Sequence, residues 1–434
     1  MNLHEKIKNK NAVMAVIGLG YVGLPLAVEI SKSGYKTIGL ELDKEKVNKI
    51  NEGINYIKDI DNDIFEDIIT SRMMTATSDF KEIAKADVVC IAVPTPLDKY
   101  QQPDLSYIKS SLESMLPYMH KDMLIILEST TYPGTTEEVL KPALESSGMK
   151  CGVDFYLAFS PERVDPGNKT YNTKNTPKVV GGVTDECTKM AAAMYESILE
   201  APIHKVSSPA VAEMEKLLEN TYRNINIGLI NELAILSNKM NINIWEVIDA
   251  AKTKPYGFQA FYPGPGLGGH CIPLDPYYLS WKAREYGVHT SMIESSMTIN
   301  DRMPEYTVNR AMKILNRFGK AISKSTILIL GIAYKKDIDD HRESPAIDVI
   351  EELEKLDANI KYYDPYISTF DKNGKVRMSE KKLNRELLNE TDLIIITTDH
   401  TDIDYNFIQK NSQFIFDTKN AMKNVKIRKN IELL

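Results

Sequence analysis

The sequence is poor in cysteine and in long apolar runs. Only four cysteines occur in 434 residues, at positions 90, 151, 187 and 271, and no two of them form a CxxC pair. A disulfide framework or a zinc site is therefore not expected, and we expect no metal. No apolar run approaches the ~20 residues that cross a bilayer. The first residues, MNLHEKIKNKN, are charged where a signal peptide is apolar, which indicates a cytoplasmic protein without a membrane partner.

Net positive charge is also lacking. The chain has 53 Lys and Arg against 60 Asp and Glu, which gives a formal net charge of −7 at pH 7, and its basic residues are dispersed. A nucleic-acid-binding chain usually concentrates its cations, so a nucleic-acid partner is not expected. An acidic chain can still bind an anionic small molecule in a local basic pocket. The length, with 43% hydrophobic residues, is typical of two or three globular domains.

A glycine motif is present near the N-terminus. An apolar strand is expected at 13–17, followed by GxGxxG at 18–23, a helix at 24–33 and a second strand at 36–42. Glycines in this place let the backbone approach a pyrophosphate at the N-terminus of the helix. Glu41 is placed to bind a ribose diol and would repel a 2′-phosphate, so NAD is favoured over NADP. The alternative is a tight turn without a ligand. The expected cofactor-binding residues of this segment are Gly18, Gly20, Tyr21, Val22, Gly23, Glu41 and Asp43.

Two later strands end in threonine-containing turns. ADVVCIAVPTP carries Thr95, and DMLIILESTTYPGT carries Thr130. In an open parallel sheet, ligands lie beyond the carboxyl ends of the strands, which places both threonines at the cofactor crevice. Either threonine could instead cap a helix. A further strand end, in FYLAFSPERVDPGN, carries Glu162 and Arg163.

The second half of the chain repeats the alternation of strands and helices. The segment 325–365 indicates strand, loop, helix, strand and a final acid, Asp364, and two further strands are expected in ETDLIIITTDH and SQFIFDTKN. The loop after its first strand lacks GxGxxG. It offers cations that suit a phosphate, above all bidentate arginine. The alternative is a solvated charge cluster, because aspartates stand at 337, 339 and 340. The cationic or imidazole residues of this loop are Lys335, Lys336, His341 and Arg342.

An apolar pattern over 208–242 predicts one long helix between the two halves, which bridges the sheets and offers a dimer face. Lys216, Asn220 and Arg223 share one face of it, which indicates either a lined pocket or an exposed stripe. The expected fold is α/β, with two doubly wound Rossmann-like sheets joined by the long helix and a helical domain. The expected domains are 1–205 for NAD binding, 206–318 for the central helices and 319–434 for the second sheet.

The stretch FYPGPGLGGHCIPLDP, at 261–276, is too rich in glycine and proline for a helix or a central strand, so it predicts a shaped loop around Cys271. A thiolate that adds to an aldehyde makes a thiohemiacetal, which can give hydride to a nicotinamide and become a thioester that water cleaves. A rigidly held cysteine could therefore let one enzyme take an alcohol to an acid. Gly268 and Gly269 would leave room for the substrate. The alternative for a lone cysteine is a small buried apolar residue.

Seven motifs together resemble the UDP-glucose/GDP-mannose dehydrogenase family over nearly the whole chain. Within that family, the chain is most similar to the branch that acts on UDP-N-acetylhexosamines. The motifs are GLGYVGLP at 18–25, PTP at 94–96, ESTTYPGTT at 128–136, SPERVDPGN at 160–168, EKLLENTYRNINIGLINE at 215–232, GPGLGGHCIPLDP at 264–276 and KKDIDDHRESPA at 335–346.

The resemblance implies an NAD-dependent, four-electron oxidation of C6 of a nucleotide sugar, for surface polysaccharide synthesis. It also implies a dimer formed through the central helix and a C-terminal domain that binds the UDP-sugar. Cys271 is similar to the nucleophile of the family, and Lys216 to the lysine that stabilises oxyanions and takes part in proton transfer. Asn220 and Asp275 match groups that hold the thiohemiacetal and organise water.

The resemblance extends to residues around the reacting carbon and the substrate. Thr130 and Glu162 match positions near the reacting centre and its water. The residues implied to contact substrate are Glu162, Arg163, Val164, Lys216, Asn220, Arg223, Tyr262, Gly268, Lys335 and Arg342.

Two departures from the UDP-glucose branch bear on the sugar. Leu274 stands where that branch has lysine, with His270 before the cysteine, and GFQAFYPGPG lacks the arginine expected near this loop. Both favour an N-acetylated sugar, and the wording of the loop favours UDP-N-acetylglucosamine. UDP-N-acetylmannosamine and UDP-glucose stay open as alternatives. Two other classes compete: a single-step dehydrogenase of the hydroxyacid or 6-phosphogluconate kind, and an NAD-sensing regulator. Neither explains the cysteine loop.

Overall fold

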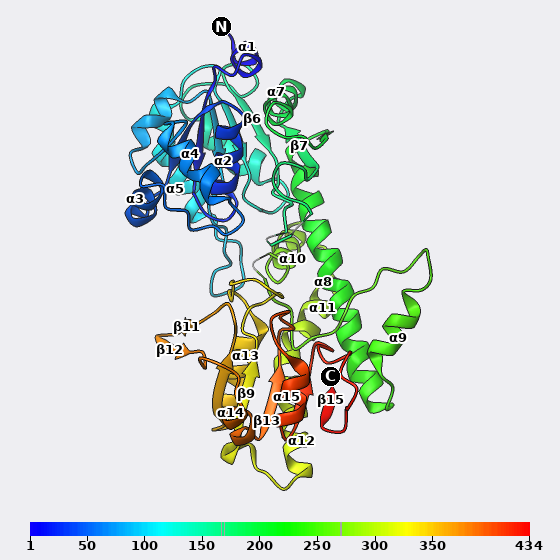
Figure 1. The fold of residues 1–434 in the computed structure, drawn as a ribbon. Coiled ribbons are helices and arrows are strands. Elements are labelled where there is room, and N and C mark those ends of the chain that lie inside the picture. The colour runs from blue at the N-terminus through cyan, green and yellow to red at the C-terminus, as the bar shows by residue number, and fades with distance from the viewer. Residues whose placement is uncertain (166, 169, 270) are drawn as a thin grey trace. The chain divides into compact units, whose positions relative to one another are not determined.

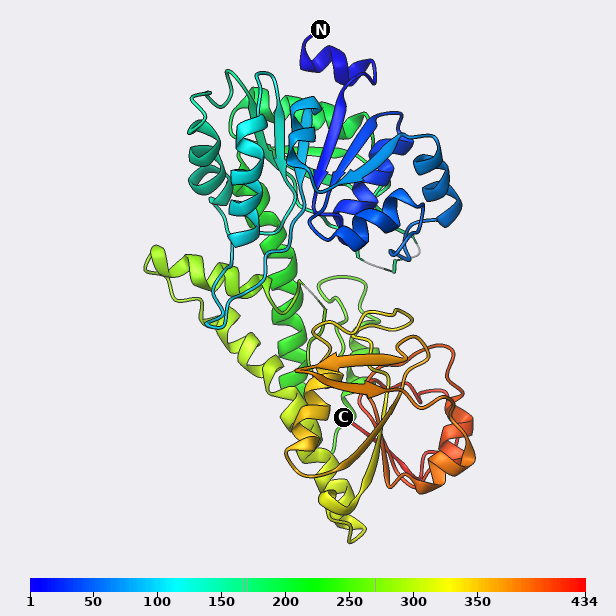
Figure 2. The same ribbon diagram turned by 90° about the vertical axis from the view of Figure 1, so that its left-hand side faces the viewer.

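The computed structural model describes residues 1–165, 167–168, 170–269 and 271–434 (Figures 1 and 2). The chain forms two compact units. The first contains Met1–Glu219 and Tyr277–Val288, and the second contains Asn220–Pro276 and His289–Leu434. The chain therefore passes between the units after residues 219, 276 and 288. The three domains expected from the sequence remain a prediction.

The first unit contains an eight-stranded sheet in the order β3-β2-β1-β4-β5-β6-β7-β8. All neighbouring strands are parallel except β6 and β7. The first six strands have the order 3-2-1-4-5-6, which is the arrangement of dinucleotide-binding folds. The sequence did not indicate β3, β7 and β8. The strands are β1 (Val13–Ile17), β2 (Lys36–Leu40), β3 (Met74–Thr77), β4 (Val88–Ile91), β5 (Leu124–Leu127), β6 (Tyr156–Phe159), β7 (Lys178–Gly182) and β8 (Ile203–Val206).

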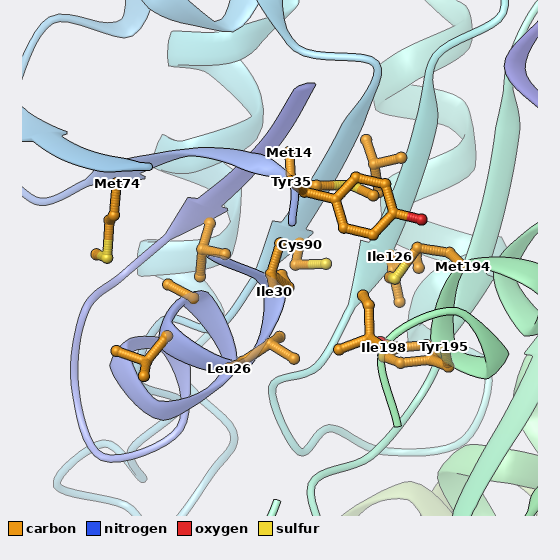
Figure 3. Packing of buried hydrophobic residues seen from close by; sticks show 14 of the residues in the cluster. Met14, Leu26, Ile30, Tyr35, Met74, Cys90, Ile126, Met194, Tyr195 and Ile198 are labelled. Atoms are coloured by element: carbon orange, nitrogen blue, oxygen red, sulfur yellow. The ribbon is translucent and has the colours of Figure 1, made fainter. Parts of the chain in front are cut away.

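Helices cover both faces of this sheet, because its central strands are buried on both sides. Successive residues of β1 alternate between two apolar layers: Met14 and Val16 lie in one, and Ala15 and Ile17 in the other. Figure 3 shows part of the first layer, where Leu26 and other side chains of α2 meet the sheet. The helices are α1 (Leu3–Lys8), α2 (Gly23–Lys32), α3 (Lys44–Asn51), α4 (Asn62–Thr70), α5 (Ser106–Met115), α6 (Lys141–Glu145) and α7 (Asp185–Glu196), with short turns η1 (Phe80–Lys85), η2 (Leu116–Tyr118) and η3 (Thr136–Leu140).

The second unit contains a five-stranded parallel sheet in the order β10-β9-β13-β14-β15. The four strands expected from the sequence are confirmed, whereas β15 and a separate hairpin of β11 and β12 were not expected. The strands are β9 (Thr326–Leu330), β10 (Asn359–Tyr363), β11 (Thr369–Lys372), β12 (Lys375–Met378), β13 (Leu393–Ile396), β14 (Ile415–Asp417) and β15 (Ile431–Leu433). The helical elements are α9 (Ile244–Ala251), α11 (Ser291–Asp301), α12 (Met303–Arg317), η4 (Ile322–Lys324), α13 (Pro345–Glu354), α14 (Arg385–Glu390) and α15 (Tyr405–Asn411).

Two helices contribute to both units. The long helix α8 (Pro209–Lys239) has 31 residues, which confirms the expected central helix, and α10 (Asp275–Glu285) comes directly after the cysteine loop. The α/β fold with two doubly wound sheets is likewise confirmed. None of the helices in the described part of the chain combines the length and the apolar character that a bilayer crossing requires.

Asp364, the acid at the end of β10, closes the loop after β9. Its Oδ2 accepts hydrogen bonds from the backbone N–H groups of Ile332, at 2.6 Å, and Ala333, at 3.0 Å, and lies 3.1 Å from Nε2 of His400. Burial alone would raise the pKa of Asp364, but the hydrogen bonds from His400 and the backbone lower it below its ordinary value. Asp364 thus follows the second strand of its sheet, as Glu41 does in the first unit, but its side chain is fully buried, whereas that of Glu41 is 14% exposed.

We predict that Asp364→Asn lowers the free energy of unfolding by about 2–4 kcal/mol, because the amide nitrogen replaces an acceptor that serves charge-assisted hydrogen bonds. Chemical denaturation followed by circular dichroism measures this change. Asp357→Asn is the matched control, since Asp357 is exposed and has a positive φ of 56°, which asparagine tolerates.

The difference in free energy of unfolding between Asp364→Asn and the wild type should depend on pH. Because the folded-state pKa of Asp364 is lowered, its contribution is complete above the unfolded value near ~3.9 and is lost as pH falls through the folded value. The gap in stability should therefore be constant at neutral pH and narrow in acid. An equal loss in Asp357→Asn, or a gap that widens in acid, would contradict this role.

Candidate active site

The glycine motif after β1 separates structural from ligand-facing positions. A Cβ on Gly18, where φ is +87°, would lie 2.6 Å from the carbonyl oxygen of Ala92, and a Cβ on Gly23 would lie 1.9 Å from that of Gly18. Nothing lies within 4 Å of a Cβ built on Gly20. Close packing therefore explains the first and third glycines, while the backbone at Gly20 faces open space that a pyrophosphate can approach.

Glu41 lies directly after β2 and faces the same loop. Its Oε2 accepts a hydrogen bond from the N–H of Leu19, its Oε1 accepts one from the N–H of Asp43, both at 3.1 Å, and its side chain is 14% exposed. The Nζ of Lys46 lies 3.8 Å from Oε2, a cation that the sequence did not indicate. Asp43 itself caps α3 by accepting from Glu45 N–H. These residues fit a dinucleotide ribose held by one partly exposed carboxylate.

The remaining cofactor candidates lie in loops after strands. Tyr21 is 43% exposed, and Val22 precedes the first residue of α2. Thr95 and Thr130 are half-buried beyond β4 and β5. Neither threonine caps a helix, because the N-caps of the next helical elements are Leu105 and Thr135. The backbone carbonyl of Thr95 accepts a hydrogen bond from the hydroxyl of Tyr278.

Lys216 is a buried cation on α8, with 8% of its surface exposed. Within the described ranges, its ammonium group makes no hydrogen bond and no ion pair. A buried charge without a partner is costly, so a protein retains one where a ligand or a reaction uses it. At Lys216, this observation favours the interpretation that this face of α8 lines a pocket over the interpretation that it is an exposed stripe. Farther along the same face, Asn220 is half-buried and Arg223 is exposed.

Glu213, one turn before Lys216, was missed from the sequence. It is fully buried, and its carboxylate accepts hydrogen bonds from the N–H of Gly134, at 2.6 Å, and from the N–H and hydroxyl of Thr136, at 2.9 and 2.7 Å. Burial raises its pKa, and these hydrogen bonds oppose that rise. The contacts fasten the segment that carries Thr130 to α8. The i−3 spacing from Lys216 is the signal that could have identified Glu213.

Arg163 and Glu162 lie after β6 and contact different partners. The guanidinium of Arg163 forms an ion pair with Glu219, lies 3.4 Å from Glu215 and donates to the carbonyl of Pro177 at 3.0 Å. Burial, and then the neighbouring Glu219, raises the pKa of Glu215 to about 7. The carboxylates of α8 thus engage Arg163, and its contact with substrate remains a prediction.

The cysteine loop lies at the start of α10 in the second unit. Cys271 is half-buried, whereas the other three cysteines are buried. Its carbonyl oxygen accepts hydrogen bonds from the N–H groups of Leu274 and Asp275, at 3.0 and 2.9 Å, which forms the turn into α10. The side-chain amide of Asn220 donates to the buried carboxylate of Asp275. The structure therefore brings Asn220, Asp275 and the backbone of Cys271 together.

A buried polar network, also missed from the sequence, ties this loop to α8. Asn224 donates to the carbonyl of Ile272 at 3.2 Å, and Asn231 accepts from the N–H of Gly264 at 3.0 Å. Two side chains of α11 complete it: the hydroxyl of Ser296 donates to Asn224 at 2.9 Å, and Asn300 bridges Asn224 and Asn231. The described parts of the loop are thus held at both ends by amides of one helix.

The glycines before Cys271 have a packing reason that the sequence did not suggest. A Cβ on Gly268 would lie 2.7 Å from Cδ of Pro345 and 2.8 Å from Cβ of Tyr334. At Gly269, where φ is +98°, the nearest atom would be Cε2 of Tyr334, at 3.1 Å. Protein atoms thus fill the space on the Cβ side of Gly268. Contact of this glycine with the substrate remains a prediction. His270 lies outside the described residues.

The cations of the second sheet are unequal. Lys335 is half-buried, while the exposed Arg342 binds Asp340 through Nε, at 2.9 Å, and Nη2, at 2.6 Å. Asp340, one of the aspartates that suggested a solvated charge cluster, is thus an ion-pair partner of Arg342. Lys419 lies just after β14, and its ammonium makes no hydrogen bond or ion pair among the described residues. Burial lowers its pKa. The sequence signal for Lys419 was its place at a strand end, equivalent to that of Thr130.

Tyr262, the last substrate candidate, is 45% exposed and stacks on Trp245, with ring centroids 5.9 Å apart. The described residues contain no group of three or more His, Cys, Asp or Glu that could hold a metal ion.

Three consecutive family models match the chain. They are the NAD-binding domain, the central domain and the UDP-binding domain of the UDP-glucose/GDP-mannose dehydrogenase family, at residues 12–199, 210–302 and 328–424. The first match includes the glycine loop after β1, the second includes the helices that hold the cysteine loop, and the third includes the cations of the second sheet.

Individual relatives extend over nearly the whole chain. Protein CapL of Staphylococcus aureus is 38% identical over 416 residues, which cover 94% of this chain and 96% of that protein. The UDP-N-acetyl-D-glucosamine 6-dehydrogenase of Pseudomonas aeruginosa is 37% identical over 363 residues, 83% of this chain and 85% of that protein. The solved structure of a UDP-D-ManNAc dehydrogenase from Pyrococcus horikoshii has a TM-score of 0.88 and 32% identity, and covers 97% of this chain and 98% of that one. The chain belongs to the UDP-glucose/GDP-mannose dehydrogenase family and is an NAD-dependent oxidoreductase of UDP-sugars.

Proposed function

We propose that this enzyme oxidises C6 of UDP-N-acetylglucosamine to a carboxylate through a covalent intermediate on Cys271. The observation that carries the proposal is the way the cysteine loop is held. Its backbone is bonded to the buried amides of α8, and α8 also carries the buried cation Lys216, whose ammonium forms no hydrogen bond and no ion pair within the described ranges. A loop that only filled space would need neither the fixed backbone nor the buried charge.

NAD, when bound, accepts one hydride in each of two oxidation steps. The residues that would hold it are those of the β1–α2 loop, with the open backbone at Gly20 for the pyrophosphate and Glu41 for the adenosine ribose. Thr95 and Thr130 would border the nicotinamide end, because both lie beyond the carboxyl ends of central strands.

The chain's own groups would divide the chemistry of the sugar. A base removes the hydroxyl proton in the first oxidation, and Lys216 stabilises the oxygen that becomes negative. The Sγ of Cys271 then adds to the aldehyde carbon to form a thiohemiacetal. Loss of a second hydride leaves a thioester, which water cleaves to free the thiol and the acid. Asn220 and Asp275 would hold the tetrahedral oxygen and the water, and Glu162 would orient that water.

The UDP group would be bound by cations of the second unit. Lys335, Arg342 and Lys419 all lie after strands of the five-stranded sheet, where ligands of open α/β sheets bind. Arg342 would meet phosphate or ribose as a bidentate donor while Asp340 orients its guanidinium. Arg163, Val164, Arg223, Tyr262 and Gly268 remain further candidates for contact with the sugar.

The N-acetylated sugar is favoured by the cysteine loop. Leu274 replaces a cation at the position where the UDP-glucose branch has lysine. Relatives named for UDP-N-acetylglucosamine and for UDP-N-acetylmannosamine occur at similar identity, 37% and 34%. The residue sequence of the loop favours the gluco configuration, and UDP-N-acetylmannosamine is the second candidate.

We further propose a cytoplasmic homodimer that serves surface polysaccharide synthesis. Along α8, large apolar side chains recur every three, four or seven residues and are exposed, which suits a helix face that packs against its own copy. These side chains are Val211, Met214, Leu218, Tyr222, Leu229, Leu233 and Leu236.

The reaction predicts a stoichiometry. With limiting UDP-N-acetylglucosamine and excess NAD, two moles of NADH should form per mole of UDP-sugar, because alcohol and aldehyde are both oxidised. NADH absorbance measured to completion gives this ratio, and a parallel panel of UDP-sugars ranks the substrates by kcat/KM. A ratio of one would indicate a single-step dehydrogenase, and no NADH from any UDP-sugar would favour an NAD-sensing regulator.

The covalent step predicts different behaviour for two variants of Cys271. Cys271→Ser should lose steady turnover by a factor on the order of 10³ or more, yet still bind NAD and UDP-sugar. The serine hydroxyl can form an ester with the substrate, and its oxygen is a poor leaving group when water attacks that ester. Intact-protein mass spectrometry should therefore show a substrate adduct at position 271. Cys271→Ala is the control and should show no adduct. Wild-type rates of acid formation in Cys271→Ala would rule out the covalent mechanism.

Glu41 predicts the choice of cofactor. The wild type should prefer NAD strongly, and Glu41→Gln should raise the NADP-to-NAD ratio of kcat/KM about 10-fold, the equivalent of ~1.4 kcal/mol. The variant keeps an acceptor for Leu19 N–H, removes the charge that repels a 2′-phosphate and leaves Lys46 beside it. Glu45→Gln, on the exposed face of α3, is the matched control. Equal shifts in both variants would contradict this placement of the ribose.

A further inference from the structure

A buried cation lies beneath the carboxylate of Glu162. Lys178, on β7, is almost completely buried, and its ammonium donates to Glu128 at 2.7 Å and to the carbonyl of Pro161 at 3.3 Å. The same Nζ lies 3.7 Å from Oε2 of Glu162. Neither β7 nor this lysine was part of the site expected from the sequence.

The two oxygens of Glu162 have different surroundings. Oε1 accepts hydrogen bonds from the N–H groups of Arg163, at 2.8 Å, and Val164, at 2.7 Å. Oε2 makes the contact with Lys178, and the side chain is 17% exposed. One oxygen is thus fixed by the backbone of its own loop, while the other is held in place by a charge from the sheet below.

Lys178 is itself prevented from moving by a second, fully buried carboxylate. Glu128 accepts from Lys178 through Oε2 and from the hydroxyl of Tyr195 through Oε1. The ammonium also lies 5.0 Å from the centre of the Tyr195 ring. Burial of these charges is costly unless each is paired, which is why Lys178 and Glu128 occur together. A simple apolar filling would have served the core of the sheet as well.

We propose that Lys178 is a positioning residue for Glu162, which holds the carboxylate in its orientation from beneath. The inference rests on the proposed function, in which Glu162 orients the water that cleaves the thioester. An ionised carboxylate can accept a proton from that water, and a neutral one cannot. A cation a few ångströms away favours the ionised form.

The other titratable groups around Glu162 do not supply this charge. Burial raises the pKa of the Cys90 thiol, on β4, and of the Tyr195 phenol, on α7, so both stay neutral. Arg163 is also charged and interacts electrostatically with Glu162, but its guanidinium is bound to Glu215 and Glu219. Glu128 carries the same sign as Glu162. Among the described residues, Lys178 is therefore the cation that forms an ion pair with the Glu162 carboxylate.

The test uses two variants, of which only one should shift the pH profile of kcat to higher pH. Lys178→Met combined with Glu128→Gln removes one positive and one negative buried charge, which leaves no unpaired ion in the core. Glu162 then loses its cation, and the acidic limb of the profile should move to higher pH, by less than the about one to three units that loss of a cation alone gives, because the opposing charge of Glu128 is removed as well. Glu128→Gln alone removes the negative charge and keeps Lys178, so its acidic limb should stay or move to lower pH.

Two further measurements separate positioning from packing. In Lys178→Arg, which keeps a cation at this position, the acidic limb should lie close to that of the wild type. In a Glu162→Gln background, the double variant should cause no further shift, because the group that responds is absent. A uniform loss of kcat at all pH values, or an upward shift in Glu128→Gln equal to that of the double variant, would overturn the proposal. Failure of the proposed function would appear separately, as one NADH or none per UDP-sugar in the wild type.

Discussion

The hydrogen bond from Asn224 to the carbonyl of Ile272 is the contact on which the geometry of the cysteine loop depends. A glycine–proline loop has no secondary structure to satisfy its backbone groups, and groups buried without partners are costly. Asn231 provides the corresponding contact at the other end of the loop, through the N–H of Gly264. With both ends bonded to α8, the loop takes its position from a helix rather than from its own flexible residues.

This dependence explains why α8 carries so many buried polar side chains. Glu213 binds the segment that carries Thr130, Lys216 presents its charge, and Asn220 binds the carboxylate at the start of α10. A misplacement by ~1 Å of a reacting group can cost ~10²-fold in rate. Within the second unit, side chains one turn apart on α8 have fixed relative positions, so Asn220 and Asn224 together position the segment from Ile272 to Asp275.

Features with a local signal could be predicted from the sequence, whereas features that arise from contacts between distant residues could not. Most strands of both sheets, the length of α8 and the glycines after β1 have local signals, namely apolar runs, helical spacing and GxGxxG. Lys178 had none, because a lysine in a short strand looks like a solvated charge until Glu128 and Tyr195 are brought beside it. The reason for Gly268 was also hidden, since its contacts Tyr334 and Pro345 lie far away in the sequence.

The two sheets show how one topology gives two kinds of ligand site. In each, an acid after the second strand bonds to backbone N–H groups of the loop after the first: Glu41 to Leu19, and Asp364 to Ile332 and Ala333. Glu41 stays partly exposed, so one carboxylate can serve both the loop and a ribose. Asp364 is sealed beneath His400, and the amides it binds are no longer available to a phosphate. The loop after β9 accordingly offers side-chain cations, Lys335 and Arg342, whereas the loop after β1 offers the open backbone at Gly20.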